Sequence, residues 1–189
     1  MKNKLFLMVI SILLTTGVYA RDLNRGYRGF VEWDNAIGNT DYRKKGVGQY
    51  GNGTLWFLGI STSHGYQFNN HWFLGAGAMI SCGFPKNDKV IPGFAEVRYD
   101  TNLGKFTPFA DLRAGYYFDG LSEGGLYLSP TIGYTFRMTK NLNFNFGIGM
   151  TLKSFTKHIY THTGNNPGLI NTEINYYPLL AVRIGIEFQ

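Results

Sequence analysis

The residues best suited to nucleophilic chemistry lie in one polar stretch of the C-terminal third. Ser154 could supply a nucleophile, and His158 or His162 could act as its base. Glu173, further along the same stretch, could orient that base. None of these residues falls in a recognised motif. We therefore predict no catalytic residues and keep an enzyme only as an alternative.

Two other reactive features have simpler explanations. Ser63 and His64 are adjacent, but adjacent residues of a strand point to opposite faces, so the two side chains cannot cooperate directly. His158 and His162 are four residues apart and lack a third ligand, which makes them a poor metal site. Cys82 is the single cysteine, so an intrachain disulfide is excluded. We predict neither a metal nor another cofactor.

The composition narrows the class of protein further. The chain of 189 residues has the length of one domain, and its 25 glycines and 16% aromatic residues favour β-structure. A mean hydropathy of −0.14 excludes a polytopic helical membrane protein. The formal net charge of +6 is spread along the chain and forms no stripe, so nucleic acid is not an expected partner.

The first twenty residues have the order of a secretory signal peptide. Lys2 and Lys4 precede the apolar run 5–14, and small residues lead to a predicted cleavage after Ala20. The apolar run is too short for a membrane helix, which needs about 20 apolar residues. The mature domain is therefore predicted to span 21–189.

Beyond the signal peptide, apolar residues recur at every second position in eight segments. This period is that of a β-strand. In each segment one row is apolar, and the other row holds small residues and nearly all of the charges. The predicted strands cover residues 27–37, 54–68, 72–82, 93–103, 110–116, 126–137, 142–153 and 180–188.

The connections between these segments alternate in length. Short connections are predicted at 69–71, 104–105 and 139–141, and long polar ones at 38–53, 83–91, 119–124 and 154–175. Short turns at one rim and long loops at the other are typical of a transmembrane barrel. We predict an all-β fold, an eight-stranded antiparallel up-and-down transmembrane β-barrel. The alternative is a lipocalin-like or sandwich fold, which would bury the apolar row and expose the charges.

Aromatic residues near the predicted strand ends support the barrel, because such barrels carry an aromatic girdle at each membrane interface. One girdle is predicted from Tyr27, Tyr66, Phe68, Trp72, Phe106, Phe136 and Phe188. The other is predicted from Trp33, Trp56, Tyr116, Phe118 and Tyr176.

The signal peptide, the eight amphipathic strands and the terminal strand ending in an aromatic together resemble the small OmpA- and OmpX-type outer-membrane barrels. The resemblance implies residence in the outer membrane of a Gram-negative bacterium. It also implies that the barrel assembly machinery reads Phe188 as part of the assembly signal, displaced by one residue because Gln189 follows it. Some barrels of this size resemble lipid A acylases or deacylases, which is the enzymatic alternative.

The lumen of an eight-stranded barrel is just wide enough for side chains to fill. Its inward charges should therefore pair with one another. The predicted ion-pair network comprises Arg28, Glu32, Asp34, Glu96, Arg98, Asp100, Asp111, Arg113, Arg137, Lys153, Arg183 and Glu187.

Turn chemistry and charge matching predict some of the pairs. A two-residue turn at Gly104 and Lys105 would place Arg98 opposite Asp111 and Glu96 opposite Arg113. Charge matching alone would place Arg28 opposite Glu187, and Glu32 opposite Arg183, where the last strand closes on the first.

These features predict a charge-plugged barrel that serves a structural or surface-binding role through its loops. Outer-membrane lipids, including the phosphates of lipopolysaccharide, are the expected partners of five basic loop residues, while any extracellular ligand stays unidentified. These residues are Arg43, Lys44, Lys45, Lys86 and Lys89. The alternatives are a lipid A-modifying enzyme and a small-solute channel gated by the interior ion pairs.

Overall fold

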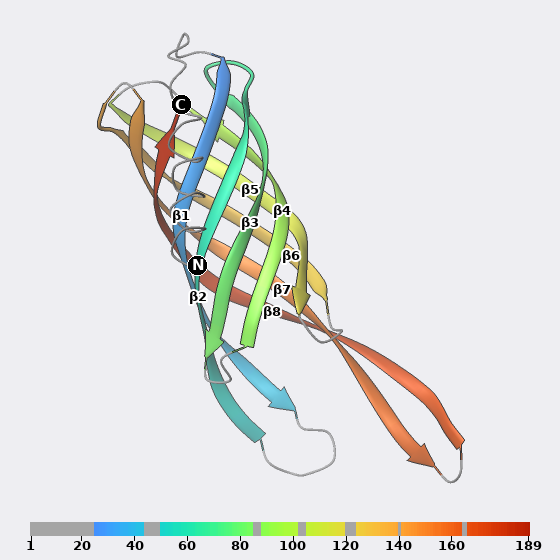
Figure 1. The fold of residues 1–189 in the computed structure, drawn as a ribbon. Helices are drawn as coiled ribbons and strands as arrows, with labels where there is room; N and C mark the ends of the chain where they lie inside the picture. The colour runs from blue at the N-terminus through green and yellow to red at the C-terminus, as the bar shows by residue number, and fades with distance from the viewer. Residues whose placement is uncertain are drawn as a thin grey trace, which may run out of the picture.

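The computed structural model describes residues 25–43, 50–84, 88–101, 105–119, 124–139, 141–163 and 166–189. Within these residues eight antiparallel strands form a closed barrel, in which each strand pairs with the next and the last pairs with the first (Figure 1). The predicted fold is confirmed, and the closed ring rules out the sandwich. The signal peptide lies outside the described residues. The strands are β1 (Gly26–Arg43), β2 (Tyr50–Gln67), β3 (Trp72–Phe84), β4 (Asp88–Asp100), β5 (Phe106–Asp119), β6 (Gly125–Arg137), β7 (Leu142–Thr163) and β8 (Asn166–Phe188).

The barrel is built inside out relative to a soluble protein. The apolar row of each strand faces outward, so that Trp33 is 61% exposed and Ile132 is 65% exposed. The alternate row faces the lumen, where Glu96 and Arg98 have no exposed surface. This alternation follows from the two-residue period of the strand, and it confirms the assignment of the rows to the two faces. No helix among the described residues is long and apolar enough to cross a membrane.

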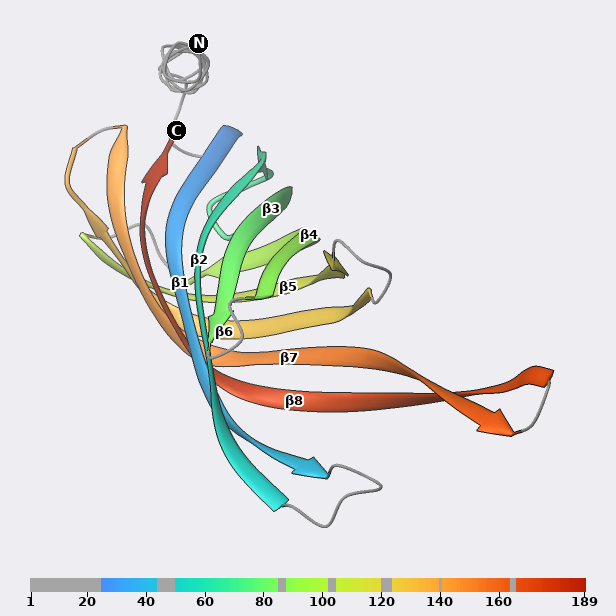
Figure 2. The ribbon, with the colours of Figure 1, turned by 60° about the horizontal axis from the view of Figure 1, so that its bottom comes forward.

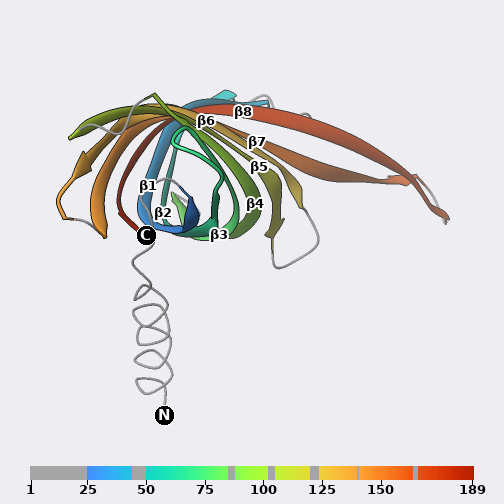
Figure 3. The same cartoon turned by 90° about the horizontal axis from the view of Figure 1, so that it is seen from above.

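The two ends of the barrel differ in the length of their connections. At one end, here called the turn end, residues 68–71 join β2 to β3, and both the start of β1 and the end of β8 lie there. At the other end, the hairpin end, β1–β2 and β7–β8 extend well beyond the ring and diverge (Figure 2). The view along the barrel shows the β7–β8 hairpin projecting farthest from the ring (Figure 3).

The structure corrects the predicted long loops. Strand pairing in β1–β2 continues to Arg43 opposite Tyr50, and in β7–β8 to Thr163 opposite Asn166. The predicted loops 38–53 and 154–175 were therefore too wide, as was the loop 83–91, because β3 and β4 still pair at Gly83 opposite Asp88. The physical reason is that backbone donors and acceptors in these stretches find partners within their own hairpin, where β-branched and aromatic residues favour extended backbone.

The register between strands matches one prediction and overturns another. Arg98 faces Asp111 and Glu96 faces Arg113 across β4 and β5, as the turn predicted. The predicted β1–β8 register is wrong by two residues, because Glu187 faces Phe30. No turn joins β1 to β8, so no turn fixes their register. Charge matching assumed that paired charges lie directly opposite each other, but an arginine side chain is long enough to reach a carboxylate two positions away, as Arg28 reaches Glu187. A shift of two residues keeps every side chain on the same face, so the inside and the outside of the barrel are unaffected.

Aromatic side chains ring both ends of the exposed apolar surface. Rings at the turn end contact one another, with centroids 5.3 Å apart for Phe106 and Phe136 and 4.9 Å apart for Trp72 and Tyr99. The other predicted members at this end face outward as well, namely Tyr27, Tyr66, Phe68 and Phe188. At the hairpin end Trp33, Trp56, Tyr116 and Tyr176 are exposed, and the side chain of Phe118 lies outside the description.

Candidate functional site

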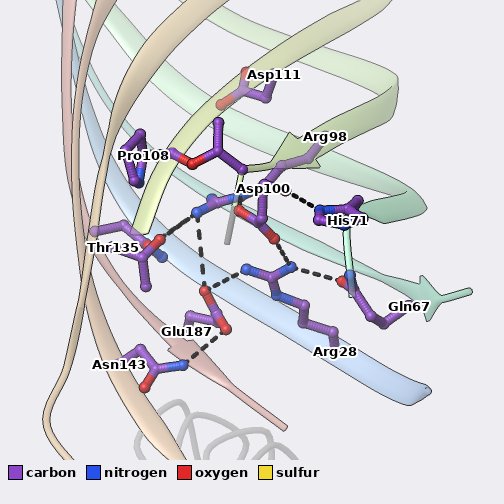
Figure 4. A network of polar contacts seen from close by, with 12 residues as sticks. Arg28, Gln67, His71, Arg98, Asp100, Pro108, Asp111, Thr135, Asn143 and Glu187 are labelled. Carbon is purple, nitrogen blue, oxygen red and sulfur yellow. Dashed lines mark hydrogen bonds and ion pairs between the residues drawn. The ribbon is translucent and has the colours of Figure 1, made fainter. Parts of the chain in front are cut away.

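The lumen near the turn end holds a balanced group of charges, here called the turn-end cluster: Arg28, Arg98, Asp100 and Glu187 (Figure 4). The Arg28 guanidinium lies 2.5 Å from an Asp100 oxygen and 2.7 Å from a Glu187 oxygen. Nε of Arg98 lies 3.0 Å from the other Asp100 oxygen. Two guanidinium groups therefore meet two carboxylates, and the cluster is neutral.

Polar and aromatic neighbours complete the turn-end cluster. Arg28 also donates to Oε1 of Gln67 at 2.6 Å, and Asn143 donates to Oε1 of Glu187 at 2.9 Å (Figure 4). Arg98 stacks 3.6 Å from the ring centroid of Phe109, which faces the lumen from β5. The charges are thus removed from water but are held by hydrogen bonds and aromatic faces, as buried ions require.

A second group, here called the mid-lumen cluster, lies closer to the hairpin end: Arg113, Arg183, Glu32, Asp34, Glu96 and Asp111. Arg113 is its hub, because its guanidinium pairs with Glu32, with Glu96 at 3.2 Å and with Asp34 at 3.7 Å. Arg183 pairs with Asp111 at 2.9 Å and with Asp34 at 3.3 Å. Two guanidinium groups here face four carboxylates, so the formal charge of the cluster is negative.

Because the mid-lumen cluster has fewer guanidinium groups than carboxylates, serine hydroxyl groups provide additional hydrogen bonds within it. Ser61 donates to Asp34 and accepts from Arg113, and Arg183 donates to Oγ of Ser129 at 3.1 Å. These serines come from lumen-facing positions where small residues leave room for long arginine side chains.

Lys153 is the next cation toward the hairpin end, and it stands apart from both clusters. Lys153 is 1% exposed, and its Nζ has no hydrogen-bond partner in the described part of the chain. The ammonium instead lies 3.5 Å from the ring centroid of Phe57. Lys153 and Asp34 both line a small cavity. The volume that the centre of a water molecule can reach in it is about 10 Å³, which is enough for one water.

Toward the hairpin end the lumen holds a layer of buried apolar residues that the sequence analysis missed. It comprises Ala36, Leu55, Phe57, Met79, Val90, Phe94, Tyr117, Tyr127, Leu179 and Ala181. Its signal was present in the alternation, because lumen-facing positions near the hairpin end of several strands are apolar.

The remaining predicted residues are not brought together. Arg137 is half-buried at the end of β6 and takes part in no ion pair within the described ranges. Lys89 is exposed on β4, Arg43 ends β1, and Lys44, Lys45 and Lys86 lie outside the described residues. None of the described residues forms a group of three or more metal-ligating side chains.

The candidates for nucleophilic chemistry are also separated. Ser63 is buried in the lumen while His64 faces outward, so the two point to opposite faces as predicted. Ser154 is buried, and its Oγ accepts from the Leu126 amide at 2.7 Å. The side chains of His158, His162 and Glu173 lie outside the description, although their backbone belongs to the β7–β8 hairpin.

Comparison with solved structures identifies the architecture. The crystal structure of Neisserial surface protein A (NspA) superposes with a TM-score of 0.57 and 13% sequence identity, covering 86% of this chain and 98% of that one. The fold is that of a small outer-membrane β-barrel. The outer membrane protein OprG from Pseudomonas aeruginosa has a TM-score of 0.46 and 14% identity, covering 87% of this chain and 95% of its own. No family model and no curated protein matches the chain.

Proposed function

We propose that this outer-membrane barrel is a closed scaffold that does not conduct and that presents its two long hairpins at the bacterial surface. In this proposal the turn end faces the periplasm and the hairpin end faces the outside. The observation that carries it is the filled lumen, in which an apolar layer lies above two clusters of paired charges. The role of the protein is then binding or structural support.

The exposed surface supports placement in a membrane. Large apolar side chains face outward on every strand of the barrel, and aromatic rings bound this surface at both ends. A soluble protein rarely exposes a contiguous apolar patch of more than a few hundred Å². This surface is suited to contact with acyl chains between the two membrane interfaces. The aromatic Phe188 at the end of β8 is also consistent with the proposal that the barrel assembly machinery recognises it as part of the assembly signal.

The interior supports closure to solutes. Arg28, Arg113 and Arg183 extend across the lumen to carboxylates on other strands, and Arg98 lies between Asp100 on its own strand and Glu187 on β8. Each guanidinium occupies space that water would need. The cavity beside Lys153 admits about one water molecule. A permeating ion would have to separate ion pairs and then cross the apolar layer, and both steps are costly.

The hairpins support a binding role. Toward the hairpin end, the ladder between β1 and β8 ends at Ile37 opposite Leu180. Beyond this pair the two hairpins leave the ring as separate two-stranded ribbons. Their length displays side chains well beyond the membrane interface. Arg43 ends β1 and Lys89 lies on β4, and in the sequence Lys44, Lys45 and Lys86 belong to the segments that connect β1 to β2 and β3 to β4. These basic residues are suited to the phosphates of lipopolysaccharide in the surrounding leaflet.

Planar-bilayer recording tests the closed interior. We expect the purified barrel to insert without steady conductance over a wide range of voltage. Steady single-channel conductance would contradict the closed scaffold and would favour the gated channel.

Lipopolysaccharide binding tests the role of the basic residues. Replacing Arg43, Lys44 and Lys45 by serine should weaken binding to lipopolysaccharide micelles, because it removes three positive charges at the hairpin end. Replacing Arg25 and Lys105, which are exposed at the turn end, is the control and should leave binding unchanged. Unchanged binding in the first variant would show that these residues do not recognise the lipid phosphates.

A further inference from the structure

We propose that Tyr27, Gly29 and His64 form an acceptor for the ring of Phe188, and that this contact locks the seam between β1 and β8. We call the four residues the clasp. Phe188 ends β8 and faces Gly29 on β1, and Gly29 in turn faces His64 on β2. The three positions form one row across three strands on the outward face of the barrel.

Gly29 leaves the space that the Phe188 ring fills. A Cβ atom at position 29 would lie 2.6 Å from both Cε2 and Cζ of Phe188 and 3.1 Å from Nδ1 of His64. Real Cβ atoms essentially never approach a ring carbon so closely, so a larger residue would displace the ring. The ring therefore crosses over the backbone of β1 and reaches β2, as aromatic residues do when they cover a glycine in a neighbouring strand.

His64 is held in place by hydrogen bonds at both ring nitrogens. Its Nε2 lies 2.9 Å from Oγ1 of Thr62, which itself donates to the carbonyl of Phe30 at 3.1 Å. Because the Thr62 hydrogen is used, Nε2 is the donor to Thr62, and Nδ1 accepts from the Tyr27 hydroxyl at 2.5 Å. A polar ring on the lipid-facing surface is costly unless its groups are satisfied, and here they are.

The aromatic contacts bind the end of the chain to this fixed histidine. The Phe188 ring meets His64 edge to face at 6.0 Å and lies tilted against Tyr27 at 6.3 Å. Tyr27 stacks on His64 at 6.0 Å with 19° between the ring planes. The last residue of β8 is thus tied to both β1 and β2.

The position of the clasp gives it a role that other aromatic contacts of the surface lack. The seam joins the first and last strands, so it closes the longest loop in the chain, and no turn fixes it. The described ladder of the seam runs from Gly29 opposite Phe188 to Ile37 opposite Leu180, so the clasp sits at its turn end. Fraying of the seam from that end must first lift the Phe188 ring off Gly29.

The alternation of β8 explains why the aromatic residue of the clasp is at position 188. Glu187 faces the lumen and pairs with Arg28, so the next residue must face outward. A shift by one residue would place the ring inside and the carboxylate in lipid.

Unfolding rates of the barrel refolded from urea into phosphatidylcholine vesicles test the proposal without any assembly factor. We expect Gly29→Ala to unfold at least about tenfold faster than wild type, because the added methyl wedges the ring away. Gly93→Ala is the matched control, since a Cβ at this outward-facing glycine of β4 meets nothing within 4 Å. An unchanged rate for Gly29→Ala would overturn the proposal.

Coupling separates a clasp from an ordinary aromatic in the girdle. Phe188→Leu should speed unfolding in the wild-type background and should have little further effect in Gly29→Ala, because the ring has already lost its place. Effects that simply multiply in the double variant would show that the ring contacts only lipid.

A disulfide across the seam tests whether the faster unfolding of Gly29→Ala begins at the β1–β8 seam. It also keeps the test decisive if Gly29→Ala folds poorly. Val31 and Ile186 face each other across the seam, so we would introduce Val31→Cys and Ile186→Cys in a Cys82→Ala background. Oxidation should bring the unfolding rate of Gly29→Ala close to that of the oxidised parent. A defect that persists at full size after oxidation would place its origin away from the seam and overturn the proposal.

Discussion

The two charge clusters of the lumen are built from the same residue types and differ in their balance. The turn-end cluster matches Arg28 and Arg98 with two carboxylates, whereas the mid-lumen cluster sets Arg113 and Arg183 against four. The first cluster is therefore balanced in charge. The second depends on serine hydroxyls, and Lys153, which shares a cavity with Asp34, has no hydrogen-bond acceptor among the described residues.

This difference determines how each cluster responds to the loss of a charge. Removing one member of a buried ion pair costs more than the pair itself contributes, because the partner stays in a dry environment without compensation. In a balanced cluster a second neutralisation can restore the balance. In the mid-lumen cluster the loss of one arginine leaves several carboxylates that share a single remaining guanidinium.

The largest effect is expected for Arg113→Met. This change removes the only ion-pair partner that the described residues provide for Glu32 and for Glu96, so the free energy of unfolding should fall by about 3–5 kcal/mol or more. Urea titration in vesicles, followed by tryptophan fluorescence, measures it. Arg137→Met is the matched control and should change stability by less than about 0.5 kcal/mol, since Arg137 is half-buried and unpaired in the described ranges. Equal effects in the two variants would refute the assignment of Arg113 as hub.

A smaller effect is expected for Arg28→Met, because Arg98 stays beside Asp100 and within 4.0 Å of Glu187. We expect a loss of about 2 kcal/mol in the same titration. Adding Glu187→Gln should recover part of this loss by making the turn-end cluster neutral again. Adding Glu32→Gln to Arg113→Met should recover less, since three carboxylates still face one guanidinium. Equal recovery in both clusters would remove the distinction between them.

The contrast between the clusters shows how far the sequence could predict this interior. Alternation placed each charge on its correct face, and the turn near Lys105 predicted that Arg98 faces Asp111. The predicted register of the seam failed because no turn constrains β1 against β8. The contacts across the lumen, such as that of Arg113 with Glu32, join strands that are not neighbours, so pairing rules between adjacent strands could not reveal them.

The length of the hairpins and the apolar layer were missed for different reasons. Polar composition suggested loops in 154–175, but the backbone pairs within the hairpin whatever its side chains contact. The apolar layer was visible at positions such as Leu55 and Leu179, which share the inward row with charged residues nearer the turn end. Only the closed barrel shows that these positions on different strands come together at the same level of the lumen.

Neutralising single carboxylates should separate the clusters more finely. Glu187 uses both oxygens, accepting from Arg28 and from Asn143, so Glu187→Gln should cost about 2 kcal/mol. Glu96→Gln should cost less than about 1 kcal/mol, because it reduces the excess negative charge of the mid-lumen cluster. The two variants carry the same chemical change, so each serves as the control for the other. The reverse order of costs would show that the excess charge does not govern stability.

The smallest effect is expected where the lumen changes from ionic to apolar. Lys153→Met keeps the volume and the contact with Phe57 and removes an ammonium that has no hydrogen-bond acceptor among the described residues. The gain from no longer burying that charge offsets the lost attraction to Asp34, which lines the same cavity, so stability should change by less than about 1 kcal/mol. Bilayer recordings should stay silent, because the apolar layer and the arginines remain in place. A loss as large as that of Arg113→Met would mean that Lys153 is a full member of the mid-lumen cluster and balances its charge through the intervening cavity.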